Sequence, residues 1–128
     1  MKTKVKGTEE SISDLKMNEI LNRADKGNVA YLILNDLPAN SLTMKMMQCI
    51  QEELKSINND NNIRVVVIES ASNKIFCSGH NLKEVKSMVK ENDIDSQKKL
   101  FSECSAMMKS LQSLSKPTIA KINGIATA

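Results

Sequence analysis

The sequence has little of several residue types, and each shortage excludes a class of function. Aromatic residues make up 2% of the chain, which leaves no stacking platform for nucleic-acid bases. The 18 basic residues are offset by 15 acidic ones, for a formal net charge of +3. This mixture predicts no basic face of the kind that binds nucleic acid, so we expect no nucleic-acid partner.

Metal-ligating and cross-linking residues are also scarce. The three cysteines, Cys49, Cys77 and Cys104, are widely spaced, and His80 is the only histidine. Neither a zinc site nor a disulfide framework can be drawn from this set, and free thiols indicate a cytoplasmic protein. No apolar run reaches the length that crosses a bilayer, and no secretory signal is recognisable, so we expect no membrane partner.

The 128 residues suffice for one domain or part of one. Residues 1–17 are polar and unpatterned, and we expect a flexible N-terminal arm there. The domain then covers residues 18–128. The expected strands are one at 29–34, which follows a hairpin turn at 25–28, one at 63–68 and one at 118–122. The expected helices are one at 43–57, a short one from about 81 and one at 96–114, with a loop at 71–79. Alternating strands and helices predict an α/β fold with a parallel sheet, in which the 63–68 strand is covered on both sides.

The segment most suggestive of function is 76–84, which reads Phe-Cys-Ser-Gly-His-Asn-Leu-Lys-Glu. Gly79 lets the backbone turn sharply beside a ligand, and Asn81 is a good helix cap. Backbone N–H groups at such a helix start can stabilise the oxygen of a polarised carbonyl. On spacing alone, the commoner interpretation stays open, in which Gly79 closes a loop and Asn81 caps a helix.

The side chains around this glycine each allow two interpretations. His80 could be a general base, but it has no partner at a motif spacing, and we favour a role for its backbone N–H. Cys77 could be a nucleophile or, more simply, a small apolar core residue. Lys83 could reach a phosphate or could be a solvated surface lysine.

The methionines are similarly ambiguous. As flexible apolar side chains they could line an acyl pocket, or they could fill the core at helical spacing. The residues concerned are Met44, Met46, Met47, Met107 and Met108.

Four segments together resemble the enoyl-CoA hydratase/isomerase (crotonase) family in order and spacing. The first is the strand at 29–35 followed by Pro38-Ala39-Asn40-Ser41-Leu42, similar to N-R-P-x-x-x-N-A-L, and the second is the valine strand at 64–68. The third is 76–84, which resembles F-x-A-G-A-D-[LI]-K-E. The fourth is 116–126, similar to K-P-x-I-A-x-[IV]-N-G-x-A. The resemblance extends over about residues 18–128.

The resemblance implies an α/β spiral of β-β-α units, the ClpP/crotonase fold, incomplete at the C-terminus. It implies acyl-CoA thioesters as substrates and an enolate stabilised in an oxyanion hole, with the backbone N–H of His80 as one donor. Asn81, Leu82 and Lys83 would contact the coenzyme A part, with Lys83 at a phosphate or the ribose. The loop carrying Ala39, Ser41 and Leu42 would enclose the adenine end. No cofactor is expected beyond the coenzyme A that the substrate carries.

The sequence also departs from the family pattern. His80 stands where the family usually has Ala, and Asn81 where it has Asp. The family's second oxyanion donor and its acid–base glutamates would follow Ala128. We therefore expect an N-terminal half of the domain that is inactive as 128 residues, and a trimer or hexamer at full length. The alternative is a non-catalytic fragment or subunit that assembles with a second polypeptide, such as a C-terminal partner chain.

Overall fold

The computed structural model describes residues 15–17 and 20–127. Most of the predicted N-terminal arm, residues 1–14, lies outside the described residues. Its last three residues, Leu15–Met17, form strand β1 and pair antiparallel with the next strand, β2 (Leu21–Lys26). The sheet therefore begins before residue 18, because backbone pairing with β2 can recruit a segment that has no apolar pattern of its own.

The strands form a five-stranded sheet in the order β1-β2-β3-β4-β6. The predicted hairpin is confirmed: β2 runs antiparallel to β3 (Val29–Leu34). β3 is parallel to β4 (Val65–Ser70), which is parallel to β6 (Thr118–Ala120). The α/β prediction is confirmed, with a sheet that is mixed because the hairpin precedes the parallel strands.

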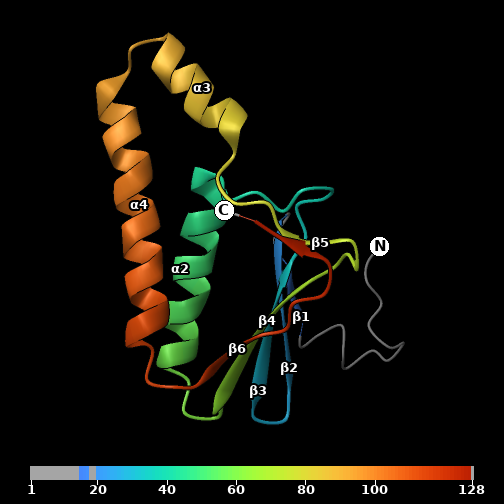
Figure 1. Ribbon diagram of the computed structural model, residues 1–128. Coiled ribbons are helices and arrows are strands. Elements are labelled where there is room, and N and C mark those ends of the chain that lie inside the picture. The colour runs from blue at the N-terminus through green and yellow to red at the C-terminus, as the bar shows by residue number, and fades with distance from the viewer. Residues whose placement is uncertain (1–14, 18–19, 128) are drawn as a thin grey trace.

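Within residues 20–127, three helices connect these strands. They are α2 (Met44–Asn58), α3 (Leu82–Lys90) and α4 (Ile94–Ser113). Each begins at a side chain that accepts a hydrogen bond from the first turn, namely Thr43, Asn81 and Asp93, and such caps satisfy N–H groups that have no partner within the helix. Figure 1 shows α2 between the sheet and α4, while α3 extends beyond the end of α2.

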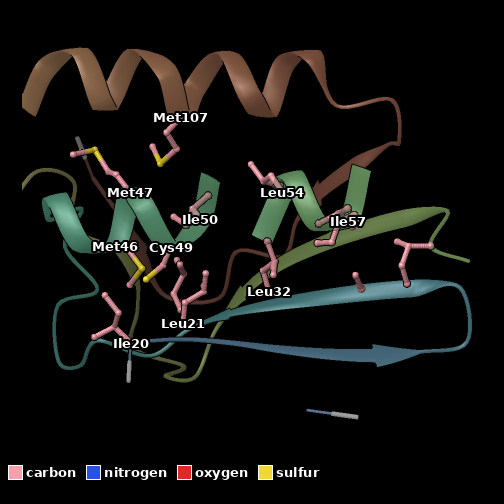
Figure 2. Close-up of a cluster of buried hydrophobic side chains, with 14 of the residues drawn as sticks. Ile20, Leu21, Leu32, Met46, Met47, Cys49, Ile50, Leu54, Ile57 and Met107 are labelled. Atoms are coloured by element: carbon pink, nitrogen blue, oxygen red, sulfur yellow. The ribbon is translucent and has the colours of Figure 1, made fainter. Parts of the chain in front are cut away.

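The core lies between the sheet and α2. Along β3 every second residue is buried, Ala30, Leu32 and Leu34, because alternate side chains of a strand point to one face. Figure 2 shows Leu32 below α2, and α4 closing the cluster from above through Met107. Full burial of each large side chain contributes about 1.5–3 kcal/mol, so this cluster is the main source of stability.

The centre of β4 is buried on both faces, as the sequence predicts. Val66 belongs to the cluster under α2, and Val67, which points the other way, is 8% exposed. Most of the methionines follow the core interpretation: Met46, Met47 and Met107 are core residues and Met44 packs against the core, whereas Met108 is exposed.

Besides β1, two short strands were not predicted. β5 (Ile75–Cys77), within the predicted loop at 71–79, pairs parallel with β7 (Ile125–Ala126). Gly124 makes this pairing possible: its φ is +96°, and a Cβ there would lie 2.5 Å from the carbonyl carbon of Lys74. Only a residue without a side chain allows the two backbones to approach so closely.

Candidate functional site

The loop that follows β3 lies against the loop that precedes α3. The N–H of Ser78 donates to the carbonyl oxygen of Ala39 at 3.1 Å, and the N–H of Leu42 donates to the carbonyl oxygen of Gly79 at 2.7 Å. Leu42 and His80 form an isolated parallel bridge. The first and third motif segments, which are far apart in the sequence, are therefore held side by side.

This bridge leaves the backbone N–H of His80 free. The hydrogen bond to Leu42 uses the carbonyl of Gly79, the residue before His80. Within the described part of the chain the N–H of His80 donates to no acceptor, and Gly79, with φ +85°, turns the backbone just before it. A backbone donor without a protein partner in a partly buried loop is available to a ligand oxygen.

The start of α3 is fixed by polar side chains. Asn81 Oδ1 accepts from the N–H of Glu84 at 2.9 Å, and Asn81 Nδ2 donates to Ser41 Oγ at 3.1 Å. The carboxylate of Glu84 in turn accepts from the N–H of Met44, at the start of α2, at 3.3 Å. The first turns of the two helices are thus tied together, and the helix dipole adds partial positive charge beside His80.

A surface hollow of about 430 Å³ opens at this junction. Six of the residues predicted from the sequence line it: Ala39, Ser41, His80, Asn81, Leu82 and Lys83. The other lining residues, Pro38 and Ser78, were not predicted, although both lie inside the motif segments. Leu42 does not line the hollow, because it packs against the hydrophobic core and acts through its N–H.

The imidazole of His80 packs against an aromatic ring. Its centroid lies 5.6 Å from that of Phe101 on α4, at an interplanar angle of 68°, an edge-to-face contact of the kind aromatic rings prefer. Its Nδ1 is buried and accepts or donates no hydrogen bond within the described residues. A general base needs an orienting partner, and this arrangement offers none.

Cys77 is half-buried beside the same loop. It packs against the hydrophobic core, and its Sγ accepts from the N–H of Gly79 at 3.4 Å. The thiol thus helps to shape the turn before His80.

The fourth motif segment reaches the same loop through β7, which pairs with β5, and through Thr127, the residue that follows the segment. The N–H of Thr127 donates to the carbonyl oxygen of Cys77 at 2.9 Å, and its hydroxyl donates to that of Ser78 at 3.1 Å. Three of the four motif segments therefore meet around the turn at Ser78 to His80.

The part of the chain that the structure describes meets the requirements of neither a metal site nor a membrane-spanning helix. Over residues 15–17 and 20–127, no group of three His, Cys, Asp or Glu side chains is placed to hold a metal ion. None of the helices described is long and apolar enough to cross a membrane.

A mixed sheet with β-β-α connections, and a glycine turn that presents a free N–H at a helix start, are features of a crotonase-type α/β protein. The chain belongs to the enoyl-CoA hydratase/isomerase family, whose model matches residues 29–127.

Relatives of known name support this assignment. The chain is 38% identical over 101 residues to the mitochondrial enoyl-CoA hydratase domain-containing protein 3 of Xenopus laevis, covering 78% of this chain and 33% of that protein. It is 31% identical over 115 residues to a probable mitochondrial enoyl-CoA hydratase 2 of Arabidopsis thaliana, covering 88% of this chain and 36% of that protein. The chain spans about a third of the length of these curated relatives.

Solved structures agree. The enoyl-CoA hydratase of Bacillus anthracis superposes with a TM-score of 0.72 at 31% identity, over 88% of this chain and 41% of that one. Human enoyl Coenzyme A hydratase domain-containing protein 3 superposes with a TM-score of 0.77 at 27% identity, over 84% of this chain and 42% of that one. The predicted family and fold are confirmed, and the matched part is less than half of a crotonase chain.

Proposed function

We propose that this chain supplies one side of an acyl-CoA thioester site, in which the backbone N–H of His80 donates to the thioester oxygen. The observation that carries the proposal is that free N–H, next to a hollow lined by the motif residues. A hydrogen bond of this kind stabilises the enolate-like oxygen that develops when a proton leaves the carbon beside a thioester carbonyl. The whole protein would then be an enoyl-CoA hydratase or isomerase.

The coenzyme A part would lie along the rest of the hollow. Leu82, 77% exposed, offers an apolar surface for the adenine or the pantetheine arm. Lys83, exposed at the edge of the hollow, offers a cation for a phosphate. Ala39 and Ser41 form the opposite wall. No cofactor other than the substrate's own coenzyme A is needed for this role.

The direct test compares two probes that differ only at the carbonyl. Butyryl-CoA carries the thioester oxygen, and S-butyl-CoA, a thioether, does not. With the protein labelled for amide NMR, we expect the His80 amide proton to move downfield with butyryl-CoA and to move much less with S-butyl-CoA. If the two probes move it equally, the N–H does not bind the carbonyl.

A pair of lysine variants tests the coenzyme A side. Lys83→Gln is expected to lower the binding affinity for both probes several-fold, because it removes a charge-assisted contact to phosphate. Lys90→Gln, on the same helix but outside the hollow, is the matched control and is expected to leave both affinities unchanged. Equal loss in the two variants would point to general electrostatic attraction.

A second candidate role is a subunit that assembles with another polypeptide or with copies of itself. Exposed isoleucines favour it: Ile119, Ile122 and Ile125 are 52%, 58% and 60% exposed, and clustered exposed apolar residues often mark an interface. Sedimentation over a range of concentrations would distinguish a self-associating chain from a monomer. Trimers or hexamers, as proposed for the full-length protein, would appear as discrete species.

A further inference from the structure

Asn40 occupies an unusual position in the loop after β3. Its φ is +48°, in the left-handed region that few residues other than glycine adopt. Its side chain is 0% exposed although it is polar. A buried polar residue in a strained conformation persists only where its surroundings fix it.

The surroundings of Asn40 use its whole side chain. Oδ1 accepts from the N–H of Asp36 at 2.8 Å. Nδ2 donates to Ser70 Oγ at 2.8 Å and to the carbonyl oxygen of Phe76 at 3.1 Å. Both amide hydrogens are therefore used, and they join the end of β4 to the strand β5 that leads into the His80 turn.

The neighbours of Asn40 continue the same connection. Ala39 accepts from Ser78, Ser41 accepts from Asn81, and Leu42 donates to Gly79. All four residues from 39 to 42 thus hydrogen-bond to the 76–81 segment. Asn40 alone among them also anchors this row to the main sheet, through Ser70.

We propose that Asn40 is the positioning residue of the oxyanion donor: its amide sets the direction of the His80 N–H by fixing the 76–81 segment against β4. This inference rests on the proposed function of that N–H. Asn40 itself lies outside the residues that line the hollow, so it would act on the carbonyl only through the backbone.

The experiment measures polarisation of the carbonyl separately from affinity. Butyryl-CoA labelled isotopically at the thioester carbonyl is bound to the protein, and the carbonyl stretch is read by isotope-edited infrared spectroscopy. A hydrogen bond to the oxygen lowers this frequency. Affinity for S-butyl-CoA is measured in parallel, because it reports coenzyme A binding without the carbonyl.

Asn40→Asp is the informative variant. It keeps the size and the acceptor for Asp36 but replaces two donated hydrogens by an oxygen facing the Phe76 carbonyl. We expect it to lose more than half of the frequency shift while S-butyl-CoA affinity is unchanged. A variant that was merely less stable would bind both probes less without changing the frequency of bound butyryl-CoA.

A second pair keeps the test valid if Asn40→Asp does not fold. Ser70→Ala removes one acceptor of the Asn40 amide. We expect this variant to lose part of the frequency shift of the butyryl-CoA carbonyl. Ser72→Ala removes a nearby hydroxyl that, among the described residues, accepts from the N–H of Lys74 alone, at 3.0 Å. This variant should leave the frequency shift of the carbonyl intact.

The outcomes separate the two proposals. If the unsubstituted protein shows no shift with butyryl-CoA, the proposed oxyanion role of His80 fails, and the inference fails with it. If the unsubstituted protein shows the shift and the Asn40→Asp or Ser70→Ala variant retains it in full, the role of His80 stands and Asn40 is not its positioning residue.

Discussion

Thr127 and Ser78 are joined by a hydrogen bond of 3.1 Å from the threonine hydroxyl to the serine carbonyl oxygen. The bond connects the residue that follows the last motif segment to the glycine turn that presents the His80 N–H. The strand pair β5 and β7 brings the two segments together, and Gly124 sits at the start of that pairing.

Gly124→Ala is expected to destabilise the protein by about 2 kcal/mol or more, because the added Cβ meets the backbone of Lys74 and Ile75 at a positive φ. Gly27→Ala is the matched control: its φ is +60°, but nothing lies within 4 Å of the added Cβ, so about 1 kcal/mol is expected. Urea denaturation of both variants measures the difference. Equal losses would show that close backbone approach is not the reason for glycine at position 124.

Leu54→Ala is expected to lower the free energy of unfolding by about 2–5 kcal/mol. Leu54, on α2, is 1% exposed within the hydrophobic core (Figure 2), and truncation of its side chain leaves a cavity. Leu82→Ala, at a side chain 77% exposed, should change stability by less than about 0.5 kcal/mol. Thermal unfolding compares the two. A large loss for Leu82→Ala would mean that this side chain packs against something in solution.

Arg23, on β2, holds carboxylates from its own strand, from α2 and from the turn after α2. Its guanidinium donates to both oxygens of Asp25, at 2.9 and 3.0 Å, and lies 3.5 Å from Glu53 and 3.4 Å from Asp60. Burial alone would lower the pKa of Arg23, but the hydrogen bond and charge of Asp25, with those of Glu53, raise it above its ordinary value. The side chain is therefore charged wherever the protein is folded.

Arg23→Ala is expected to destabilise the protein by about 1–3 kcal/mol, because it removes a buried cation, and the packing of its side chain, from a group of partly exposed carboxylates. In a Glu53→Gln background the same substitution should cost less, since one of those charges is already absent. A double-mutant cycle by chemical denaturation measures the coupling. Additive losses would show that Arg23 is not coupled to Glu53 and that its contribution comes from Asp25, Asp60 and packing.

We expect the stability of the first turn of α4 to depend on pH through Asp93, the residue that caps this helix. The hydrogen bonds from Ser96 hold the pKa of this carboxyl below its usual range. A depressed pKa in the folded state means that the cap stabilises the helix above the unfolded pKa, and that this contribution is lost as pH falls through the lower folded value, below about pH 3.9. The amide proton of Ser96 should therefore titrate with a midpoint below that pH.

Asp93→Asn is the control for this titration, because asparagine also caps helices but does not ionise in this range. The Ser96 amide of the variant should show no such titration. If it still titrates, another carboxyl is responsible and Asp93 is not the group observed.

The sequence alone determined most elements and the family. Continuous apolar runs predicted β3 and β4, and apolar residues three and four positions apart predicted α2 and α4, to within a few residues, because the local pattern reflects which faces are buried. The motif at 76–84 also predicted four of the residues that line the hollow, His80, Asn81, Leu82 and Lys83, and the segment at 38–42 predicted two more, Ala39 and Ser41. These features depend on local spacing, which a single sequence preserves.

Tertiary structure decided the rest. β1, β5 and β7 are too short to carry a periodic signal, and they exist because a partner strand distant in the sequence supplies their hydrogen bonds. The burial of Asn40, and the free N–H of His80 beside it, likewise follow from the contact between two loops. Which polar groups a loop satisfies and which it leaves for a ligand depends on what lies across from it, and that is fixed only when the chain has folded.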